Sequence, residues 1–201
     1  MPEPTIRSFV SVELPSEIRD ILEIRQNDLR AAMGRAAQSV RWTRPESVHL
    51  TLQFLGDIPS TSTSQIATVI TEACSQTRPL TLFLGSTGAF PNLNRPRVIW
   101  IGLQGDIDPL RALAASISDH LKPLGFKPDK PFQPHITLAR IRETSRPDDL
   151  HAISHALTST AARPTSSQPF TVQSVSLMQS HLQPGGSVYT QLANIPLPST
   201  P

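Results

Sequence analysis

One eight-residue pattern occurs twice, once in each half of the chain. Residues 45–52 read PESVHLTL and residues 131–138 read PFQPHITL. In each segment a Pro stands four residues before a His, and the His is followed by an apolar residue, a Thr and a Leu. The 201-residue chain has six His, and two of them stand in this context. The repeat predicts two matching strands in two related lobes.

Within each pattern the His and the Thr are two residues apart, and such residues point to the same face of a strand. His49 and Thr51 therefore share one face, as do His135 and Thr137. The apolar residues between them point the other way, toward a core. One H-x-T triplet is a weak signal, because a strand His is more often structural than catalytic. The match over eight residues indicates function for the pair.

The remaining sequence predicts hairpins separated by helices. Helices are expected over about 15–37, 64–76, 109–121 and 147–157. Strands are expected over 5–14, 40–43, 48–55 (ended by Gly56), 80–84, 97–103, 136–141, 170–180 and 187–193. The segment 85–96, GSTGAFPNLNRP, is expected to be a connection with a long tip. Strands grouped as hairpins favour an α+β fold with antiparallel sheets and helices on one face of each.

Composition narrows the class of protein. With 38% hydrophobic and 17% charged residues, the chain is typical of one globular domain over 1–201, with loose ends at 1–4 and 196–201. A net charge of +2 suits an anionic substrate but is too small to indicate nucleic-acid binding by itself. The single Cys, Cys74, is expected to be a buried hydrophobe. No apolar run is long enough to span a membrane, so a cytoplasmic location is expected.

Two imidazoles and two hydroxyls suit phosphoryl transfer without a metal. Imidazole titrates near pH ~6.5, so at neutral pH one His can be neutral and its partner protonated. The neutral imidazole removes a proton from a nucleophile, and the protonated one donates to the leaving oxygen. Each Thr hydroxyl can donate a hydrogen bond to a phosphate oxygen.

These motifs resemble the 2H phosphoesterases, specifically the bacterial RNA 2′,3′-cyclic phosphodiesterases, often labelled 2′-5′ RNA ligases. The likeness covers nearly the whole chain, including RSFVSVELPSEIR, RWTRPESVHLTLQFLGDI, GAFPNLNRPRVIWIGL, LKPLGFKPDKPFQPHITLAR and SLMQSHLQPGGSVYTQL. It implies two pseudo-symmetric lobes, each an antiparallel sheet with helices on its outer face, and an active-site cleft between them. One motif strand, about 48–55 or 135–141, would come from each lobe.

The resemblance also implies roles for the two His. His49 would be the general acid and His135 the general base, which activates water to attack a 2′,3′-cyclic phosphate and leaves a 2′-phosphomonoester. The sequence itself is symmetric on this point. With an RNA 5′-hydroxyl in place of water, the reverse reaction would form a 2′-5′ linkage. The expected partner is RNA or a nucleotide with a 2′,3′-cyclic phosphate end. No metal or other cofactor is expected, and a monomer is assumed.

Two further residues are candidates for substrate binding. The resemblance makes Arg140 a phosphate ligand, yet it stands five residues after His135 and simple strand parity puts it on the opposite face. A bulge, a strong twist or the end of the strand would be needed to bring it round; otherwise it is a surface Arg. Phe90 resembles a position near the cleft that could pack against a nucleobase, or it is core. Trp42 and Trp100 are expected to be core.

The other charged and His residues have simpler interpretations. Arg41, Arg44, Arg95 and Arg97 flank strands near the expected cleft and could attract an RNA backbone, although each alone is typical of a solvated charge. Ser180 and His181 could line its mouth. The remaining His, on helix-like segments, are expected at the surface: His120, His151 and His155.

Two other functions are compatible with a two-lobed fold. A nucleotide- or RNA-binding module could keep the cleft with little turnover, but it would not need two titrating groups. A metal hydrolase is disfavoured, because the sequence has no H-x-H, no H-E-x-x-H and no Cys/His cluster.

Overall fold

The computed structural model describes residues 3–128, 130–161, 165–166, 168–183 and 186–198. Its α-helices are α1 (Ser16–Met33), α2 (Thr63–Cys74), α3 (Ile107–Leu121) and α4 (Pro147–Thr160). Its strands are β1 (Thr5–Glu13), β2 (Val40–Trp42), β3 (His49–Pro59), β4 (Leu80–Phe90), β5 (Val98–Gly105), β6 (His135–Ile141), β7 (Pro169–Val172), β8 (Ser174–Gln183) and β9 (Gly186–Pro196). Short 3-10 turns are η1 (Gly34–Ser39), η2 (Pro45–Ser47), η3 (Ser60–Ser62) and η4 (Lys122–Leu124).

All described strands belong to one nine-stranded sheet with antiparallel pairs, in the order β7-β4-β5-β6-β3-β1-β8-β9, and β2 pairs with β6. The order is symmetric about its middle. One half holds β7, β4, β5 and β6, and the other holds β3, β1, β8 and β9. The two motif strands, β3 and β6, are the innermost neighbours, and they pair at Leu50 and Ile136. The expected sheets of two lobes are thus the halves of one sheet.

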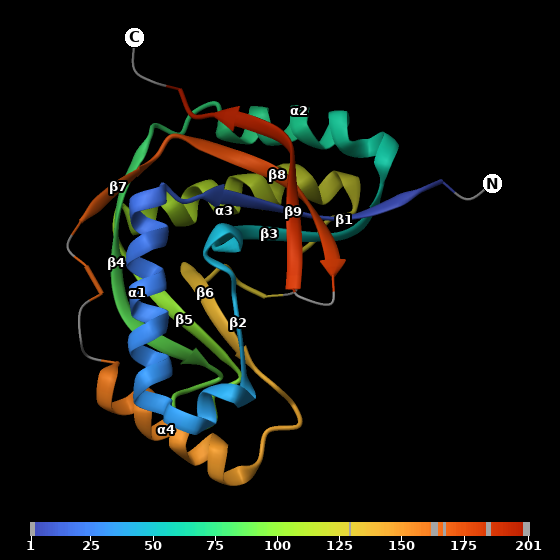
Figure 1. Ribbon diagram of the computed structural model, residues 1–201. Helices are drawn as coiled ribbons and strands as arrows, with labels where there is room; N and C mark the ends of the chain where they lie inside the picture. Colours follow the sequence, from blue (N-terminus) through green and yellow to red (C-terminus); the bar gives the residue numbers. More distant parts are fainter. Residues whose placement is uncertain (1–2, 129, 162–164, 167, 184–185, 199–201) are drawn as a thin grey trace.

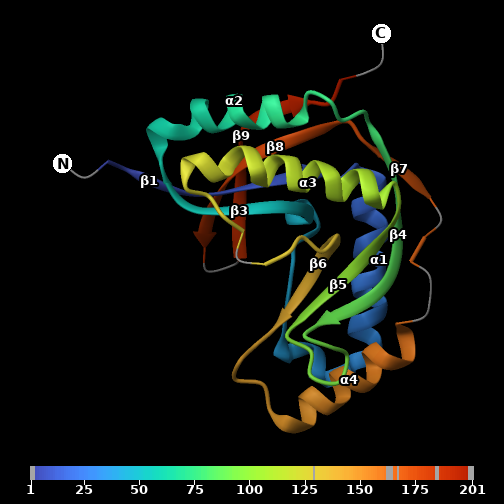
Figure 2. The same cartoon turned by 180° about the vertical axis from the view of Figure 1, so that it is seen from behind.

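Helices cover one face of each half, as Figures 1 and 2 show. α2 and α3 lie together over the half with β1, β3 and β8, where the Ser116 hydroxyl of α3 donates to the Ala73 carbonyl of α2 at 2.9 Å. α1 and α4 lie against the half with β4, β5 and β6. The helix after β1 and the helix after β5 therefore each pack on the opposite half. This exchange makes the fold α+β with internal symmetry, as predicted.

Three predicted segments differ in the structure because of local backbone geometry. The strand 48–55 does not end at Gly56; Leu55 is an extra residue in the ladder with β1, Gly56 follows it with a φ of 73° opposite Ser8, and β3 continues to Pro59. The first part of 85–96 is not a turn, because β4 runs on through Phe90 beside β5. Segment 170–180 is two strands: β7 pairs with β4, and after Gln173 β8 pairs with β1 in the other half.

The helix expected over 15–37 also ends earlier. Gly34 has a φ of 54° and its N–H bonds to the carbonyls of Ala31 and Arg30, so α1 stops at Met33 and η1 follows. Cys74 is buried as expected, and burial raises the pKa of its thiol to about 11. None of the helices in the described ranges is long and apolar enough to cross a membrane.

The buried face of the motif strands is the centre of the core. Leu50 and Ile136 are both 0% exposed, and their neighbours Leu52 and Leu138 are 6% and 0% exposed. Full burial of such side chains stabilises a fold by about 1.5–3 kcal/mol each relative to exposure. The alternation that buries these residues leaves the His and Thr side chains on the other face. We call this uncovered face of the sheet, opposite the helices, the site face.

Shortening Leu50 should therefore cost much of the stability of the protein. We expect Leu50→Ala to lower the free energy of unfolding by about 2–5 kcal/mol, because it removes buried methyl groups and leaves a cavity at the junction of the halves. Urea unfolding followed by circular dichroism measures the change. Ile24→Ala, at a position 62% exposed on α1, is the matched control and should change it by less than about 0.5 kcal/mol. Equal effects of the two substitutions would contradict the central place of this pair.

Candidate active site

The pairing of β3 with β6 brings the two motifs together on the site face. In an antiparallel ladder, directly opposite residues point to the same face. Because Leu50 is opposite Ile136, the next positions place His49 toward Thr137 and Thr51 toward His135. All four motif side chains therefore lie on one face. The two His are diagonal neighbours across the β3–β6 pair, because each lies opposite the Thr of the other strand. The four are half-buried.

The two imidazoles are held in the same way. Nδ1 of His49 donates to the Ser47 carbonyl at 2.8 Å, and Nδ1 of His135 donates to the Gln133 carbonyl at 2.6 Å. In each case the acceptor belongs to the residue two positions before the His. A neutral imidazole with Nδ1 protonated keeps its lone pair on Nε2, so both rings offer Nε2 for proton transfer.

The surroundings shift the pKa of both imidazoles below the ordinary value for His. For His49 the main cause is desolvation by burial, which outweighs the opposite effect of the bond to Ser47. For His135 burial is again the largest cause; the bond to Gln133 raises the pKa, and the positive charge of Arg140 lowers it. Only the second imidazole has a cationic neighbour among these causes.

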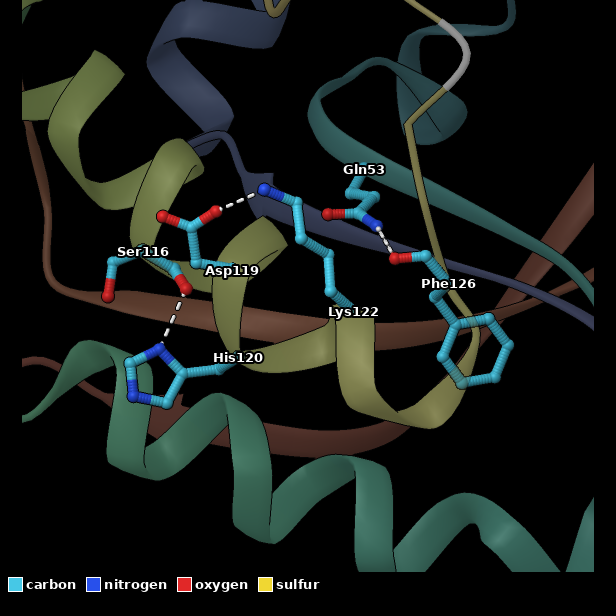
Figure 3. A network of polar contacts seen from close by, with 6 residues as sticks. All are labelled: Gln53, Ser116, Asp119, His120, Lys122 and Phe126. Atoms are coloured by element: carbon cyan, nitrogen blue, oxygen red, sulfur yellow. Dashed lines mark hydrogen bonds and ion pairs between the residues drawn. The ribbon is translucent and has the colours of Figure 1, made fainter.

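A β-bulge follows the motif on β3. Val10 of β1 lies opposite Gln53, but its neighbour Ser11 lies opposite Thr51, so Leu52 is an extra residue in the ladder. The buried Gln53 side chain points toward the helical face, where its amide lies 3.4 Å from the Phe126 carbonyl. Figure 3 shows this contact beside the end of α3. The bulge moves the next exposed side chain, Phe54, onto the site face.

The same bulge occurs at the matching position of β6. Ile99 of β5 lies opposite Ala139, and Trp100 lies opposite Thr137, so Leu138 is the extra residue. The last Leu of the repeated H-x-T-L pattern is therefore the bulged residue in both strands. Beyond it, Arg140 returns to the site face. Strand parity alone put Arg140 on the opposite face, and the bulge is what reverses that expectation.

Hydrogen bonds from one side-chain donor and one backbone donor stabilise the β6 bulge. The carbonyl of Leu138 accepts a hydrogen bond from the Thr43 N–H at 2.8 Å and another from Nε2 of Gln26 at 3.0 Å. The same Gln26 amide also donates to the Thr43 carbonyl at 2.8 Å. Gln26 is 1% exposed and comes from α1, so the crossing helix stabilises the backbone turn that orients Arg140.

Aromatic rings enclose the first imidazole. Phe9 stacks on His49 with ring centroids 4.8 Å apart and planes at 30°. Tyr189 meets His49 edge-on at 5.0 Å and also contacts Phe9 at 5.0 Å. Neither ring belongs to a predicted site residue, although alternation on β1 places Phe9 on the site face. A small cavity of about 160 Å³ adjoins His49 here and is lined in part by Glu13, Arg19 and Tyr189.

Aromatic rings also support the second imidazole. Phe90 meets His135 edge-on at 4.9 Å and lies 5.2 Å from Trp100. Trp100 itself lies 6.3 Å from His135. A Cβ at Gly88 would overlap the Trp100 ring, so only glycine lets the indole lie flat on β4. Trp100 is half-buried on the site face, a position that apolar periodicity alone did not reveal.

Four groups on the site face remain available to a substrate. In the described part of the chain the hydroxyls of Thr51 and Thr137 make no hydrogen bond, and Arg140 is exposed without an ion pair. The ring of Phe54 is 63% exposed and lies 6.0 Å from Phe9. Phe54 was missed from sequence because an apolar residue in a strand predicts core unless the bulge is known.

The other His residues lie apart from this site. His120 is exposed on α3, where Nδ1 donates to the Ser116 carbonyl at 2.8 Å, next to the Lys122–Asp119 ion pair at 2.6 Å (Figure 3). His151 and His155 are exposed on α4, as expected. His181 is exposed on β8 and contacts the Thr190 hydroxyl at 3.1 Å. Within the described ranges no three His, Cys, Asp or Glu side chains gather as metal ligands would.

The different surroundings of the two imidazoles predict different responses to Arg140→Gln. Losing the positive charge should raise the pKa of His135 toward its ordinary value and leave that of His49 unchanged. Gln26→Met should act in the same direction on His135, because it loosens the bulge that holds Arg140 in place. NMR titration of the imidazole Cε1 protons measures both values. Equal shifts of the two His, or no shift of His135, would contradict the geometry.

The comparisons with known proteins agree on one family. The profile of the 2′-5′ RNA ligase superfamily matches residues 16–184. An Archaeoglobus fulgidus protein named RNA 2′,3′-cyclic phosphodiesterase is 32% identical over 190 residues, which is 93% of this chain and 98% of the relative. A Thermus thermophilus protein of the same name is 30% identical over 96% of this chain and 90% of its own length.

Solved structures show the same fold. The crystal structure of a Thermus thermophilus protein superimposes with a TM-score of 0.75 at 28% identity, covering 96% of this chain and 98% of its own. The structure of E. coli LigT complexed with 3′-AMP gives a TM-score of 0.75 at 25% identity, covering 98% of this chain and all of LigT (100%). From the family profile, these relatives and the shared fold, the chain belongs to the 2′-5′ RNA ligase superfamily of 2H phosphoesterases.

Proposed function

We propose that this protein hydrolyses 2′,3′-cyclic phosphate ends of RNA to 2′-phosphomonoesters without a metal. The observation that carries the proposal is the matched pair of imidazoles: His49 and His135 lie on neighbouring strands, face the same side and both present Nε2. The names of the relatives, RNA 2′,3′-cyclic phosphodiesterase, support the substrate class.

In the proposed reaction each imidazole moves one proton. Nε2 of His135 takes a proton from water, whose oxygen forms a bond to phosphorus as the bond from phosphorus to the 3′ oxygen breaks. Nε2 of protonated His49 donates to that oxygen, which becomes a 3′-hydroxyl. The phosphate stays on the 2′ oxygen. The cycle closes when a proton returns from His135 to His49 through solvent.

The charge distribution favours His135 as the base. Burial and, to a smaller extent, the positive charge of Arg140 lower the pKa of His135, which favours its neutral form, while the matching position of β3 holds the uncharged Phe54. No cation is among the causes that shift the pKa of His49, and a bound phosphate anion would raise that pKa, because a nearby opposite charge favours the protonated form. The charge of Arg140 thus supports the roles that the family resemblance implies.

The hydroxyls and the guanidinium complete the phosphate site. Thr51 and Thr137 would donate to the non-bridging oxygens, and Arg140 would neutralise the charge that grows on them in the transition state. Phe54 offers an open ring on which a nucleobase can stack, and Phe90 remains a second candidate, although its ring already contacts His135. With an RNA 5′-hydroxyl in place of water, the same groups would form a 2′-5′ linkage. The alternative of a binding module gains no support from a site with two free Nε2 atoms.

Removing either imidazole should abolish most of the activity. We expect His135→Ala and His49→Ala each to lower kcat on a 2′,3′-cyclic nucleotide by about 10²–10⁴-fold, because each removes a proton-transfer step. His120→Ala, at an exposed position on α3, is the matched control and should keep wild-type kcat. Phosphorus NMR identifies the product as the 2′-monoester, and EDTA should leave the rate unchanged. Loss of activity in EDTA, a 3′-monoester product, or normal turnover by His135→Ala would refute the mechanism.

Truncating Phe54 should weaken substrate binding more than it slows the chemistry. Stacking of a base on an aromatic ring contributes about 1–3 kcal/mol, so we expect Phe54→Ala to raise KM by roughly 5–150-fold with a smaller change in kcat. Phe54→Trp should retain most of the affinity. Ile24→Ala, which also removes an exposed apolar side chain, is the control. An unchanged KM for Phe54→Ala would show that no base rests on this ring.

A further inference from the structure

A pair of arginines stands at one end of the site face. Arg41 of β2 lies directly opposite Arg140 of β6 in an antiparallel ladder, so the two side chains project to the same face. The neighbouring Trp42 points the other way, since Arg30 of α1 lies 4.6 Å over its ring. Arg41 therefore faces away from the covering helix, on the side of His135 and Thr137. Both arginines are exposed.

Among the described residues no carboxylate forms an ion pair with either arginine. The ion pairs within those residues that involve Lys or Arg are Arg111–Asp108 and Lys122–Asp119, both at α3 or its end. On its other side Arg140 lies opposite Val98 of β5. Like charges directly opposite each other on a sheet are destabilising, so two adjacent guanidiniums are costly unless an anion lies between them. Guanidinium groups bind phosphate oxygens in bidentate fashion.

The position of the pair matches the direction in which a substrate chain would run. Three cross-strand pairs follow one another along β6 on the site face. They are His135 with Thr51, then Thr137 with His49, then Arg140 with Arg41. At about 3.3 Å per residue, with one residue taken up by the bulge, Arg140 lies about 7 Å beyond Thr137. The proposed mechanism places the departing 3′ oxygen, and hence the ribose, at His49. The 5′ carbon of that ribose carries the preceding phosphodiester, one nucleotide step farther along.

We propose that Arg41 and Arg140 together form a second phosphate site for the phosphodiester on the 5′ side of the terminal nucleotide. This inference rests on the proposed function and sharpens it: the preferred substrate is an RNA chain of two or more nucleotides with a cyclic end, and a cyclic mononucleotide is a poorer one. Arg41 binds substrate and takes no part in proton transfer. Arg140 serves both the reacting phosphate and its neighbour.

The test compares kcat/KM for two substrates with the same terminal base. One is a nucleoside 2′,3′-cyclic phosphate, and the other is a dinucleotide ending in that nucleotide. We expect the wild type to prefer the dinucleotide by at least about tenfold, the effect of a hydrogen bond to a charged group. Arg41→Gln should bring the ratio near one. The decrease of log(kcat/KM) with rising salt concentration should also be weaker for Arg41→Gln than for the wild type on the dinucleotide, because one screened charge contact is lost.

Two controls separate phosphate binding from other causes. Arg111→Gln removes the same charge from α3 and should leave the ratio at its wild-type value. A dinucleotide with an uncharged methylphosphonate link should lose the preference in the wild type and should be insensitive to Arg41→Gln. A wild-type ratio near one, a ratio that survives Arg41→Gln, or a methylphosphonate that keeps the preference would overturn the inference. Failure of the proposed function has a different result: neither substrate would be hydrolysed.

Discussion

The single antiparallel contact of β3 with β6 is the constraint on which the rest of the site depends. Leu50 and Ile136 meet there on the buried face, and the period of two then obliges the residues on either side to face outward together. Two motifs far apart in sequence thereby share one surface. Because the contact lies at the centre of the core, the same residues that join the halves also set the direction of the motif side chains.

The bulges explain how a symmetric backbone produces an asymmetric site. Both motif strands gain one extra residue after the Thr, at Leu52 and Leu138, and both therefore return a side chain to the site face. That side chain is an aromatic ring on β3 and a guanidinium on β6. Burial lowers the pKa of both imidazoles, and the positive charge of Arg140 is a further cause for His135 only. The bulges thus give the two imidazoles different neighbours on the site face.

Much of this could be predicted from the sequence, because the repeated pattern and its apolar frame depend on short-range periodicity. The face shared by His and Thr in each strand followed from that pattern, the α+β fold from hairpins separated by helices, and the family from the resemblance of five segments of the chain. The bulges did not, since they arise from pairing with β1 and β5, and Arg140 and Phe54 could not be placed without them. The aromatic neighbours of the imidazoles, Phe9, Tyr189 and Trp100, also depend on long-range strand order. Likewise, the change of sheet partner at Gln173 leaves no signal in a continuous β-like run.

In the proposed mechanism one site, built from both halves, uses one neutral and one protonated imidazole at the same time. The pH dependence of kcat/KM for a 2′,3′-cyclic phosphate substrate tests this most directly, because it reports the ionisations of the free protein. Both pKa values are lowered from 6.5, so the rate should rise as the base loses its proton and fall as the acid loses its own, with the maximum below pH 6.5. The predicted result is a bell-shaped plot of log(kcat/KM) against pH, in which each limb reports the ionisation of one group. A profile with a single limb, or a rate that stays constant from pH 5 to about 8, would contradict the account.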